Sequence, residues 1–228
     1  MRQLEKKTKI SEQRRQDLIV ATLRSLCKHG YLNSTINTIS EESGLSRGLI
    51  SHYFASKDDL LASAHRYYLK NADDFHRHLN ASSTRGSFEK LYLAAAGTFL
   101  RDLGYSEIII HYMSAAFMVP EIRDLHRELW GKYRRYIQRR LMVVSHETGI
   151  AVDARLEAIA LAQLSDGLWL GKTMEGAYTA EECLIIIRNY LCGLFKQNPD
   201  DHPLWPDFEL ENFPTSAPLP KRVLMTAG

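Results

Sequence analysis

Residues 35–61 read TINTISEESGLSRGLISHYFASKDDLL, and the fold follows from this stretch. Thr35 and Ser46 are hydroxyl residues of the kind that cap helix N-termini, and each precedes a short segment with apolar residues at helical spacing. Gly44 lies between the two segments, where a glycine commonly ends a helix. The pattern predicts two short helices joined by a tight turn, the second over residues 47–53. Such a pair is a helix-turn-helix, and its second helix has the size that fits the major groove of DNA.

The flanking segments predict the helices that support this pair. After Ser11, apolar residues recur at helical spacing, and Gly30 stands where a left-handed cap would end that helix. Beyond the pair, Ser56 and Asp59 have the spacing of a capping box. A long fourth helix is therefore expected to begin at Lys57 and to run to about residue 79.

The second helix of the pair divides into two faces. Leu45, Ile50 and Phe54 form an apolar set that must pack inward, which leaves Arg47 and Gly48 on the outer face. A glycine within a helix costs about 0.8 to 1 kcal/mol relative to alanine. Close approach of a phosphate or base would explain Gly48, and a packing glycine is the alternative. The residues predicted to contact DNA are Thr35, Asn37, Ser46, Arg47, Gly48, Leu49, Ser51, His52, Tyr53 and Lys57.

The basic residues are concentrated at the N-terminus. Residues 1–28 contain eight Lys or Arg and three acids, although the net charge of the whole chain is only +2. A basic arm that leads into a helix is typical of contact with a polyanion, and a solvated terminus is the alternative. The helix-turn-helix that follows favours the first interpretation.

Composition excludes several other classes of protein. With 45% hydrophobic and 25% charged residues the chain is not generally disordered, and no apolar run approaches the roughly 18 to 20 residues that cross a bilayer. The three cysteines lie far apart in apolar helical patterns, which argues against a disulfide framework or a metal site. No catalytic motif is recognisable. We expect a cytoplasmic protein without a membrane span or a cofactor.

Proline and the capping residues predict the remaining organisation. Six of the seven prolines follow residue 198, and Pro120 has the position of a first helical residue. Further amphipathic helices are expected over residues 88–103, 106–118, 120–146, 153–176 and 179–195. The predicted fold is all-α, with nine helices. The expected parts are a DNA-binding domain, a helical domain and a proline-rich tail, over residues 1–56, 57–196 and 197–228.

The quoted stretch resembles the DNA-binding domain of TetR-type transcriptional regulators. The coincident positions are Gly30, Thr35, Ile39, Gly44, Ser46, Gly48, His52, Tyr53, Phe54, Lys57, Leu60 and Leu61. GLISHYF, residues 48–54, is similar to the recognition helix of BetI-type repressors of the choline-to-betaine pathway, and LSDGLWL, residues 164–170, resembles their late core helix. Two departures are Ser40, where the family usually has alanine, and Ser51, where it usually has tyrosine.

The resemblance implies a homodimer and an effector cavity between the central helices. A dimer also suits a helix-turn-helix, because two copies read two half-sites. The expected dimer interface is an apolar seam, although such a seam can equally be core: Leu161, Leu164, Leu168, Leu184, Ile187, Leu191 and Leu194. The expected cavity residues are Tyr92, Met113, Phe117, Trp130, Asp166 and Trp169. An aromatic cage beside an acid would suit a quaternary amine such as choline.

The expected function is therefore a dimeric repressor that a small-molecule effector releases from its DNA operator. An activator or an effector-blind DNA-binding protein is the first alternative, and a helical enzyme is a remote one. The proline-rich tail also contains large apolar residues, which predict that it lies extended along the body or along the second subunit. These are Trp205, Phe208, Leu210 and Phe213.

Overall fold

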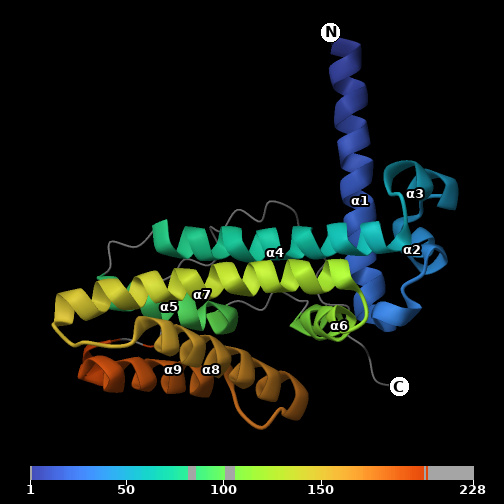
Figure 1. The fold of residues 1–228 in the computed structure, drawn as a ribbon. Helices are drawn as coiled ribbons and strands as arrows, with labels where there is room; N and C mark the ends of the chain where they lie inside the picture. Colours follow the sequence, from blue (N-terminus) through green and yellow to red (C-terminus); the bar gives the residue numbers. More distant parts are fainter. Residues whose placement is uncertain (1, 82–85, 101–105, 203, 205–228) are drawn as a thin grey trace. The chain divides into compact units, whose positions relative to one another are not determined.

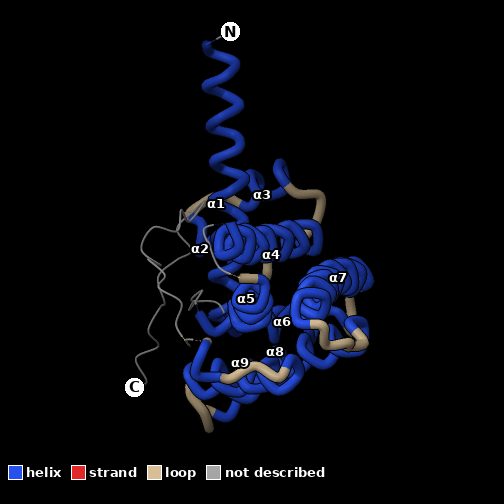
Figure 2. The backbone as a smooth tube through the Cα atoms, turned by 90° about the vertical axis from the view of Figure 1, so that its left-hand side faces the viewer, coloured by secondary structure: helices blue, strands red, loops and turns tan. Residues whose placement is uncertain are grey.

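The structure is a computed structural model that describes residues 2–81, 86–100, 106–202 and 204. Within these residues the chain is all-α, as predicted, with nine α-helices and one short 3-10 helix and no strand (Figures 1 and 2). The helices are α1 (Arg2–Asn33), α2 (Ile36–Ser43), α3 (Arg47–Tyr53), α4 (Lys57–Ala81), α5 (Ser87–Leu100), α6 (Ser106–Ala116), α7 (Pro120–Thr148), α8 (Ala154–Glu175), α9 (Ala180–Phe195) and η1 (Pro199–Asp201). No helix in this described part is long and apolar enough to span a bilayer.

The described chain forms two compact units. The first contains residues 2–71 and 106–126, and the second contains the other described residues. The first unit holds α6 as well as the helix-turn-helix, because α6 packs against α1. The units therefore do not follow the chain order in which the sequence suggests a boundary after residue 56. Both α4 and α7 contribute residues to the two units.

The core of the first unit surrounds the helix-turn-helix. Leu18, Leu23 and Leu26 of α1 are completely buried, and they belong to the same apolar cluster as Ile50 of α3 and Phe54. The predicted inner face of α3 is thus confirmed. Burying one such side chain contributes about 1.5 to 3 kcal/mol, which exceeds what a seven-residue helix could gain from its backbone alone.

The predicted helix ends of the DNA-binding segment are confirmed at most positions. Thr35 caps α2 and exchanges hydrogen bonds with Thr38, and Ser46 accepts a hydrogen bond from the backbone N–H of Leu49 at 3.3 Å. Gly44 adopts the left-handed conformation, with φ 66° and ψ 15°. These bonds join residues three positions apart, which is why the sequence alone reveals them.

Two expectations about α1 need correction. The helix begins at Arg2 rather than after Ser11, so the basic arm is itself helical. Gly30 does not end the helix in the left-handed helical conformation; its φ of 72° and ψ of 176° form a kink, after which the chain stays helical to Asn33. The kink is held because both the backbone N–H and the hydroxyl of Ser34 donate to the Gly30 carbonyl.

The second unit is built around α5, which packs against both α8 and α9. The chain beyond α9 returns to this core. His202 stacks on Phe88 with 4.0 Å between ring centroids, and its Nδ1 lies 3.0 Å from a carboxylate oxygen of Glu89. The hydroxyl of Tyr92 donates to the carbonyl of Leu204 at 3.1 Å. The tail residues for which an extended path is predicted lie outside the described residues: Trp205, Phe208, Leu210 and Phe213.

Candidate functional sites

The outer face of α3 presents polar side chains to solvent. Arg47, Ser51 and His52 are all exposed there. The Nη1 of Arg47 donates to Oδ1 of Asn37 on α2 at 3.3 Å, so the structure joins two residues that were predicted separately. A guanidinium held beside an amide at a helix surface can form paired hydrogen bonds with a base edge or a phosphate.

Gly48 lies on the same face, and nothing in the chain requires it to be a glycine. A Cβ added at this position would meet no atom within 4 Å, and the residue is exposed. The alternative that Gly48 serves packing within the chain is therefore excluded. The structure agrees with the other explanation, in which the missing side chain lets a ligand approach the backbone of α3.

The turn before α3 is held by hydroxyl groups. Ser40 donates a hydrogen bond of 2.6 Å to the carbonyl of Leu45, which gives a structural reason for the serine that replaces the usual alanine. Across the same region, the Nζ of Lys28 on α1 pairs with a carboxylate oxygen of Glu42 on α2 at 2.5 Å. These contacts restrict how α3 can tilt relative to α1 and α2.

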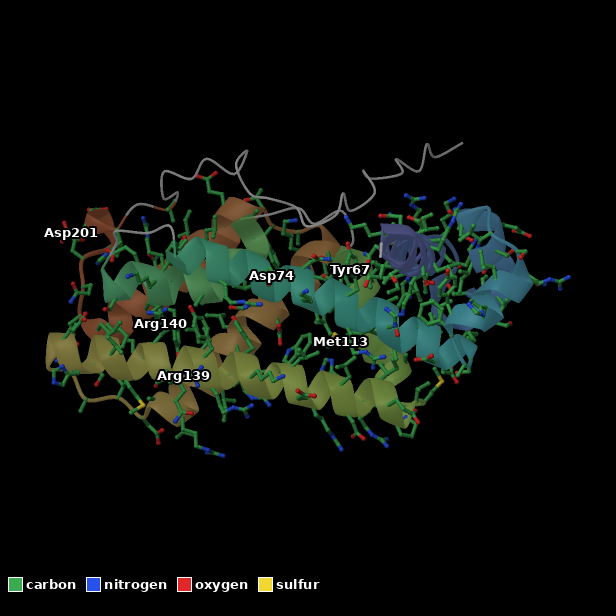
Figure 3. The ribbon with its side chains drawn as sticks, turned by 90° about the horizontal axis from the view of Figure 1, so that it is seen from above. Tyr67, Asp74, Met113, Arg139, Arg140 and Asp201 are labelled. Atoms are coloured by element: carbon green, nitrogen blue, oxygen red, sulfur yellow. The ribbon has the colours of Figure 1, made fainter. Side chains whose placement is uncertain are left out.

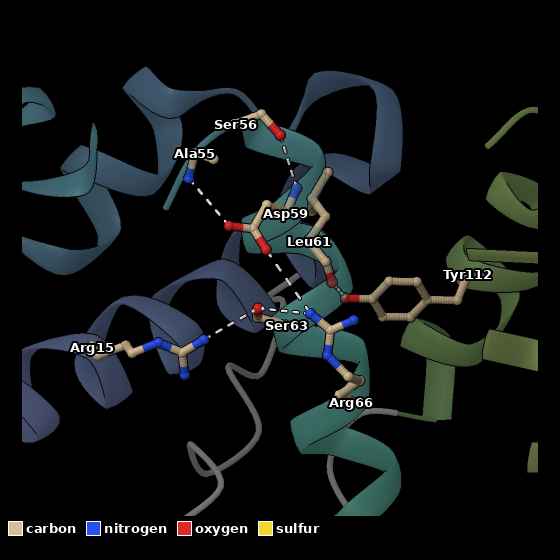
Figure 4. A network of polar contacts seen from close by, with 8 residues as sticks. All are labelled: Arg15, Ala55, Ser56, Asp59, Leu61, Ser63, Arg66 and Tyr112. Carbon is tan, nitrogen blue, oxygen red and sulfur yellow. Dashed lines mark hydrogen bonds and ion pairs between the residues drawn. The ribbon is translucent and has the colours of Figure 1, made fainter. Parts of the chain in front are cut away.

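A polar network connects the start of α4 to its neighbours, as Figure 4 shows. The hydroxyl of Ser63 accepts hydrogen bonds from Arg66 at 3.1 Å and from Arg15 of α1 at 3.4 Å. Arg66 also lies 3.9 Å from the carboxylate of Asp59. Asp59 in turn accepts from the backbone N–H of Ala55, so the predicted capping box at Ser56 is only half formed. Sequence reasoning missed Arg15 and Ser63, because they lie 48 positions apart.

Three of the predicted DNA contacts are only partly exposed. Leu49, Tyr53 and Lys57 are each half-buried, and Tyr53 packs against the first-unit core. The ammonium of Lys57 lies 5.8 Å from the ring centroid of Tyr31, near the outer limit of a cation–π contact. Burial, together with the negative charges of Asp58 and Glu121, raises the pKa of Tyr31 to about 12. The phenol of Tyr31 is therefore uncharged where its ring faces the ammonium of Lys57.

His65 belongs to the core of the first unit. It has no exposed surface, and its ring lies 3.8 Å from that of Tyr112, centroid to centroid. Burial, the charge of His126 and the charge of Arg66 lower the pKa of His65 to about 3, so the ring is neutral at ordinary pH. The described residues contain no group of three side chains able to hold a metal ion.

Two of the predicted effector residues meet in the second unit. The indole Nε1 of Trp130 on α7 donates to Oδ2 of Asp166 on α8 at 2.8 Å. Burial raises the pKa of Asp166, and the hydrogen bond from Trp130 and the charge of Arg134 oppose that shift. Trp169, one turn further along α8, is half-buried against the second-unit core. Tyr133, which is not among the predicted cavity residues, donates its hydroxyl to the carbonyl of Ala94 at 3.2 Å.

The other predicted effector residues fit less well. Phe117 is 87% exposed, so it cannot line an enclosed cavity in this conformation, and the prediction for it is corrected. Tyr92 is buried, and its hydroxyl already donates a hydrogen bond to the carbonyl of Leu204. Met113 is half-buried and, like Phe117, belongs to the first unit, whereas Trp130 and Asp166 belong to the second.

The predicted dimer seam is mainly core. Leu161, Leu184, Ile187 and Leu191 have no exposed surface within one chain, and a side chain without exposed surface cannot contact a second chain. For these four the prediction is corrected. Leu164, Leu168 and Leu194 are half-buried. The exposed apolar side chains of these helices are different ones: Leu156, Ile159, Leu170 and Met174 on α8, and Ile186 on α9.

The basic stretch of α7 is partly engaged within the chain. Lys132 pairs with Glu128 at 2.5 Å, and the guanidinium of Arg140 lies 5.2 Å from the ring centroid of Tyr136. Arg139, next to Arg140 in Figure 3, is exposed. The stretch does not form one free cationic surface.

Comparison with known proteins agrees with this arrangement. Residues 18–64 match the sequence profile of bacterial regulatory proteins of the tetR family, and residues 102–196 match that of the BetI-type transcriptional repressor C-terminal region. The HTH-type transcriptional regulator BetI of Stenotrophomonas maltophilia is 30% identical over 193 residues, which cover 78% of this chain and 91% of the relative. The chain belongs to the TetR family of transcriptional regulators. Within that family it is of the BetI type.

Solved structures share the fold of this TetR-family regulator. A transcriptional regulator from Pseudomonas aeruginosa PAO1 has a TM-score of 0.71 and 27% identity, and the match covers 84% of this chain and 95% of that one. A regulator from Saccharomonospora viridis, solved in complex with choline, has a TM-score of 0.70 and 22% identity, over 82% and 97% of the two chains. Family membership makes this chain a regulator of transcription and not an enzyme.

Replacing Gly48 by alanine should raise stability and lower DNA affinity at the same time. The free energy of unfolding should rise by about 0.8 to 1 kcal/mol, because alanine is the better helix former and the added methyl group meets no atom of the chain. Affinity for operator DNA should fall, because that methyl group blocks close approach to α3. Thermal denaturation and fluorescence anisotropy would measure the two effects.

The matched control is Gly131→Ala on α7, where the methyl group would meet only the end of the Arg135 side chain. It should leave operator affinity unchanged. Unaltered operator affinity of Gly48→Ala would show that Gly48 does not serve DNA contact.

Proposed function

We propose that this TetR-family regulator is a homodimeric repressor that reads a palindromic operator and is released by a cationic small molecule. The observation that carries the proposal is the outer face of α3. There Arg47 is exposed and bonded to Asn37, beside a glycine that the chain does not need. Such a face serves no purpose inside the protein and matches what a major groove requires.

The geometry of this face gives its residues different roles in DNA binding. Arg47 is the residue that reads bases, because its guanidinium can form two hydrogen bonds with a guanine. Ser51 and His52, exposed on the same helix, contact phosphates or base edges. Lys57, at the first residue of α4, contacts the phosphate backbone beside the groove, since it lies after the recognition helix and is held over Tyr31.

Two copies associate through the outer face of α8. Leu156, Ile159, Leu170 and Met174 are exposed there, and their spacing of three, eleven and four residues places them along one helix face. Gly167 lies on α8 as well, with open space where a Cβ would be, which allows a second helix to approach closely. The interface is isologous, so each residue contributes twice. The partly exposed Leu164, Leu168 and Leu194 lie at its edges.

The effector is a quaternary amine held near Trp130 and Asp166. A tryptophan face attracts a cation through its quadrupole, and a carboxylate beside it adds charge complementarity. The hydrogen bond between the two side chains fixes the acid next to the indole. The choline complex of the Saccharomonospora viridis regulator, which has the same fold, supports this class of effector.

Effector binding acts on DNA affinity through helices that contribute to both units. Because α4 begins directly after the recognition helix and extends into the second unit, a shift of its far end changes the spacing of the two recognition helices in the dimer. A coupling free energy of about 1 to 3 kcal/mol would weaken operator binding roughly 5-fold to 150-fold. That range is sufficient to switch a promoter.

Substitutions at Arg47 and Lys57 should have different consequences for DNA binding. Arg47→Ala should cost about 1 to 3 kcal/mol of operator affinity and relax the preference for one base, because it removes a base contact. Lys57→Ala should weaken binding to all DNA sequences by a similar factor, because it removes a phosphate contact. Anisotropy titrations with operator and scrambled duplexes measure both effects. Operator affinity equal to that of the wild type in Arg47→Ala would contradict the base-reading role.

Leu170→Glu should dissociate the dimer. Each chain loses a buried leucine worth about 1.5 to 3 kcal/mol, so the symmetric interface loses about twice that free energy. Sedimentation equilibrium measures the mass. The control is Leu32→Glu, another exposed leucine, which lies on α1 and should leave the dimer intact. A dimer that survives Leu170→Glu with unchanged affinity would exclude α8 as the interface.

Asp166→Asn should weaken choline binding by roughly tenfold, because the amide still accepts from Trp130 but carries no charge. The wild type should also lose affinity as the pH falls, and at a higher pH than an ordinary aspartate would, because the pKa of Asp166 is raised. The Asn variant should show no such dependence. Isothermal titration calorimetry at several pH values tests both statements, with Glu175→Gln at the end of α8 as the control.

A reporter fused to the promoter that this regulator controls distinguishes repression from activation. Deletion of the gene should raise expression, and choline should raise it only while the gene is present. Lower expression on deletion would identify an activator, and an unchanged response to choline would identify a protein that does not respond to this class of effector.

A further inference from the structure

The chain beyond α9 turns back onto the second unit. Lys196 ends α9 in the left-handed helical conformation, with φ 50° and ψ 39°, which is unfavourable for a residue that carries a Cβ. Asn198 then caps the short helix η1, and the backbone N–H of His202 closes it. A strained turn of this kind persists only where the surrounding contacts hold it. We name the residues that follow it, 197–202 and 204, the C-terminal strap.

Side chains of α9 and α5 hold the backbone of the strap. The Nη1 of Arg188 on α9 donates to the carbonyl of His202 at 3.2 Å, and the hydroxyl of Tyr92 on α5 donates to the carbonyl of Leu204 at 3.1 Å. Burial raises the pKa of Tyr92 well above its ordinary value, and the charge of Arg188 opposes that shift. The hydroxyl of Tyr92 therefore keeps the proton that it donates. Two directional bonds fix the strap against both helices.

The side chains of the strap cover the beginning of α5. The imidazole of His202 stacks on Phe88 with 4.0 Å between the ring centroids, and its Nδ1 lies 3.0 Å from a carboxylate oxygen of Glu89. Only 12% of the His202 side chain is exposed. Leu204 packs against the second-unit core. The strap is thus packed into this unit on the side of α5, and it is not a loose end of α9.

Further along, α5 bonds to residues beside the proposed effector site. Its carbonyls at Ala94 and Ala95 accept hydrogen bonds from the hydroxyls of Tyr133 on α7, at 3.2 Å, and of Ser165 on α8, at 3.0 Å. Ser165 directly precedes Asp166, the proposed partner of the cation. All these residues belong to the second unit, as the strap does. One helix therefore connects the strap with the effector site.

The short distance along α5 makes this connection stiff. Tyr92, which bonds to the strap, lies only two residues before Ala94. A close-packed helix transmits a displacement over such a distance instead of absorbing it. The hydroxyl donors on α7 and α8 have to follow the α5 carbonyls, because a buried donor that loses its acceptor is costly. The position of the strap therefore influences where Trp130 and Asp166 lie.

We propose that the C-terminal strap is a positioning segment for effector binding, which holds α5 in the place that the Trp130–Asp166 site requires. This inference rests on the proposed effector site and adds a segment that tunes its affinity. The match to the BetI-type C-terminal profile ends at residue 196, so the strap lies outside the shared part. The influence is reciprocal. A strap that raises the affinity for choline by some factor is itself held more tightly by the same factor once choline is bound.

The test compares two double variants of the full-length chain. His202→Ala/Leu204→Ala removes the stacked ring, the contact with Glu89 and the packed leucine of the strap. The matched control is Met142→Ala/His146→Ala, which removes one large apolar side chain and one imidazole from α7, where both are exposed. Calorimetry measures choline affinity, and anisotropy measures operator affinity without choline. Hydrogen–deuterium exchange measures the protection of residues 197–202 with and without choline.

The strap variant should bind choline about tenfold more weakly than the wild type, within the range of 5-fold to 150-fold that is typical of coupled sites. Its operator affinity without choline should equal that of the wild type, because α3 and its core belong to the first unit. In the wild type, saturating choline should slow the exchange of residues 197–202, and by the same factor if the variant fully releases the strap. The control variant should match the wild type in every measurement.

The exchange measurement on the wild type needs no variant, so it decides the question even if the strap variant does not fold. Exchange of residues 197–202 that does not respond to bound choline overturns the proposal, and so does a strap variant with unchanged choline affinity. Equal losses of choline and operator affinity show that the strap only stabilises the fold. Tighter choline binding by the strap variant identifies the strap as a competitor of the effector. A wild type that binds the operator but not choline removes the proposed effector together with this role of the strap.

Discussion

A recognition helix of seven residues cannot hold its own shape, and the rest of the first unit exists to hold it. Ile50 and Phe54 anchor α3 in a cluster with the leucines of α1 and with Leu60 and Leu61 of α4. That burial holds the inner face of α3 in place. The outer face can therefore carry residues that lower the stability of a helix, such as a glycine in its middle. The outer face of α3, which we propose reads DNA, thus depends on the core beneath it.

The same core also holds the start of α4. The hydroxyl of Tyr112 on α6 donates to the carbonyl of Leu61 on α4 at 2.8 Å, and Arg15 of α1 reaches Ser63, two residues further along α4. The segment that follows the recognition helix is therefore held from two sides. Helices under such constraint move as rigid bodies, so a displacement of α4 changes where α3 points and is not absorbed locally.

Interactions between residues that are close in the sequence were predicted well, and interactions between distant residues were not. The caps at Thr35 and Ser46 were predicted correctly, because each is a bond between residues three positions apart. The apolar seam of α9 was also recognised as a helical stripe, yet Leu184, Ile187 and Leu191 proved to be core. Periodicity shows that a face is apolar, but the elements that cover the face lie far away in the sequence. The contact between Trp130 and Asp166 spans 36 positions, and both were named only through a family resemblance.

The sequence by itself determined the all-α class, most helix boundaries and the helix-turn-helix, since backbone hydrogen bonding and capping operate within one turn. Only the tertiary structure decided which apolar faces are covered, that Gly48 has open space above it and that α1 continues as a helix through the basic N-terminal residues. The physical reason is that burial depends on all the elements that meet at a point. A pattern within one helix records how much apolar surface it offers, whereas the packing of other helices decides how much of it reaches solvent.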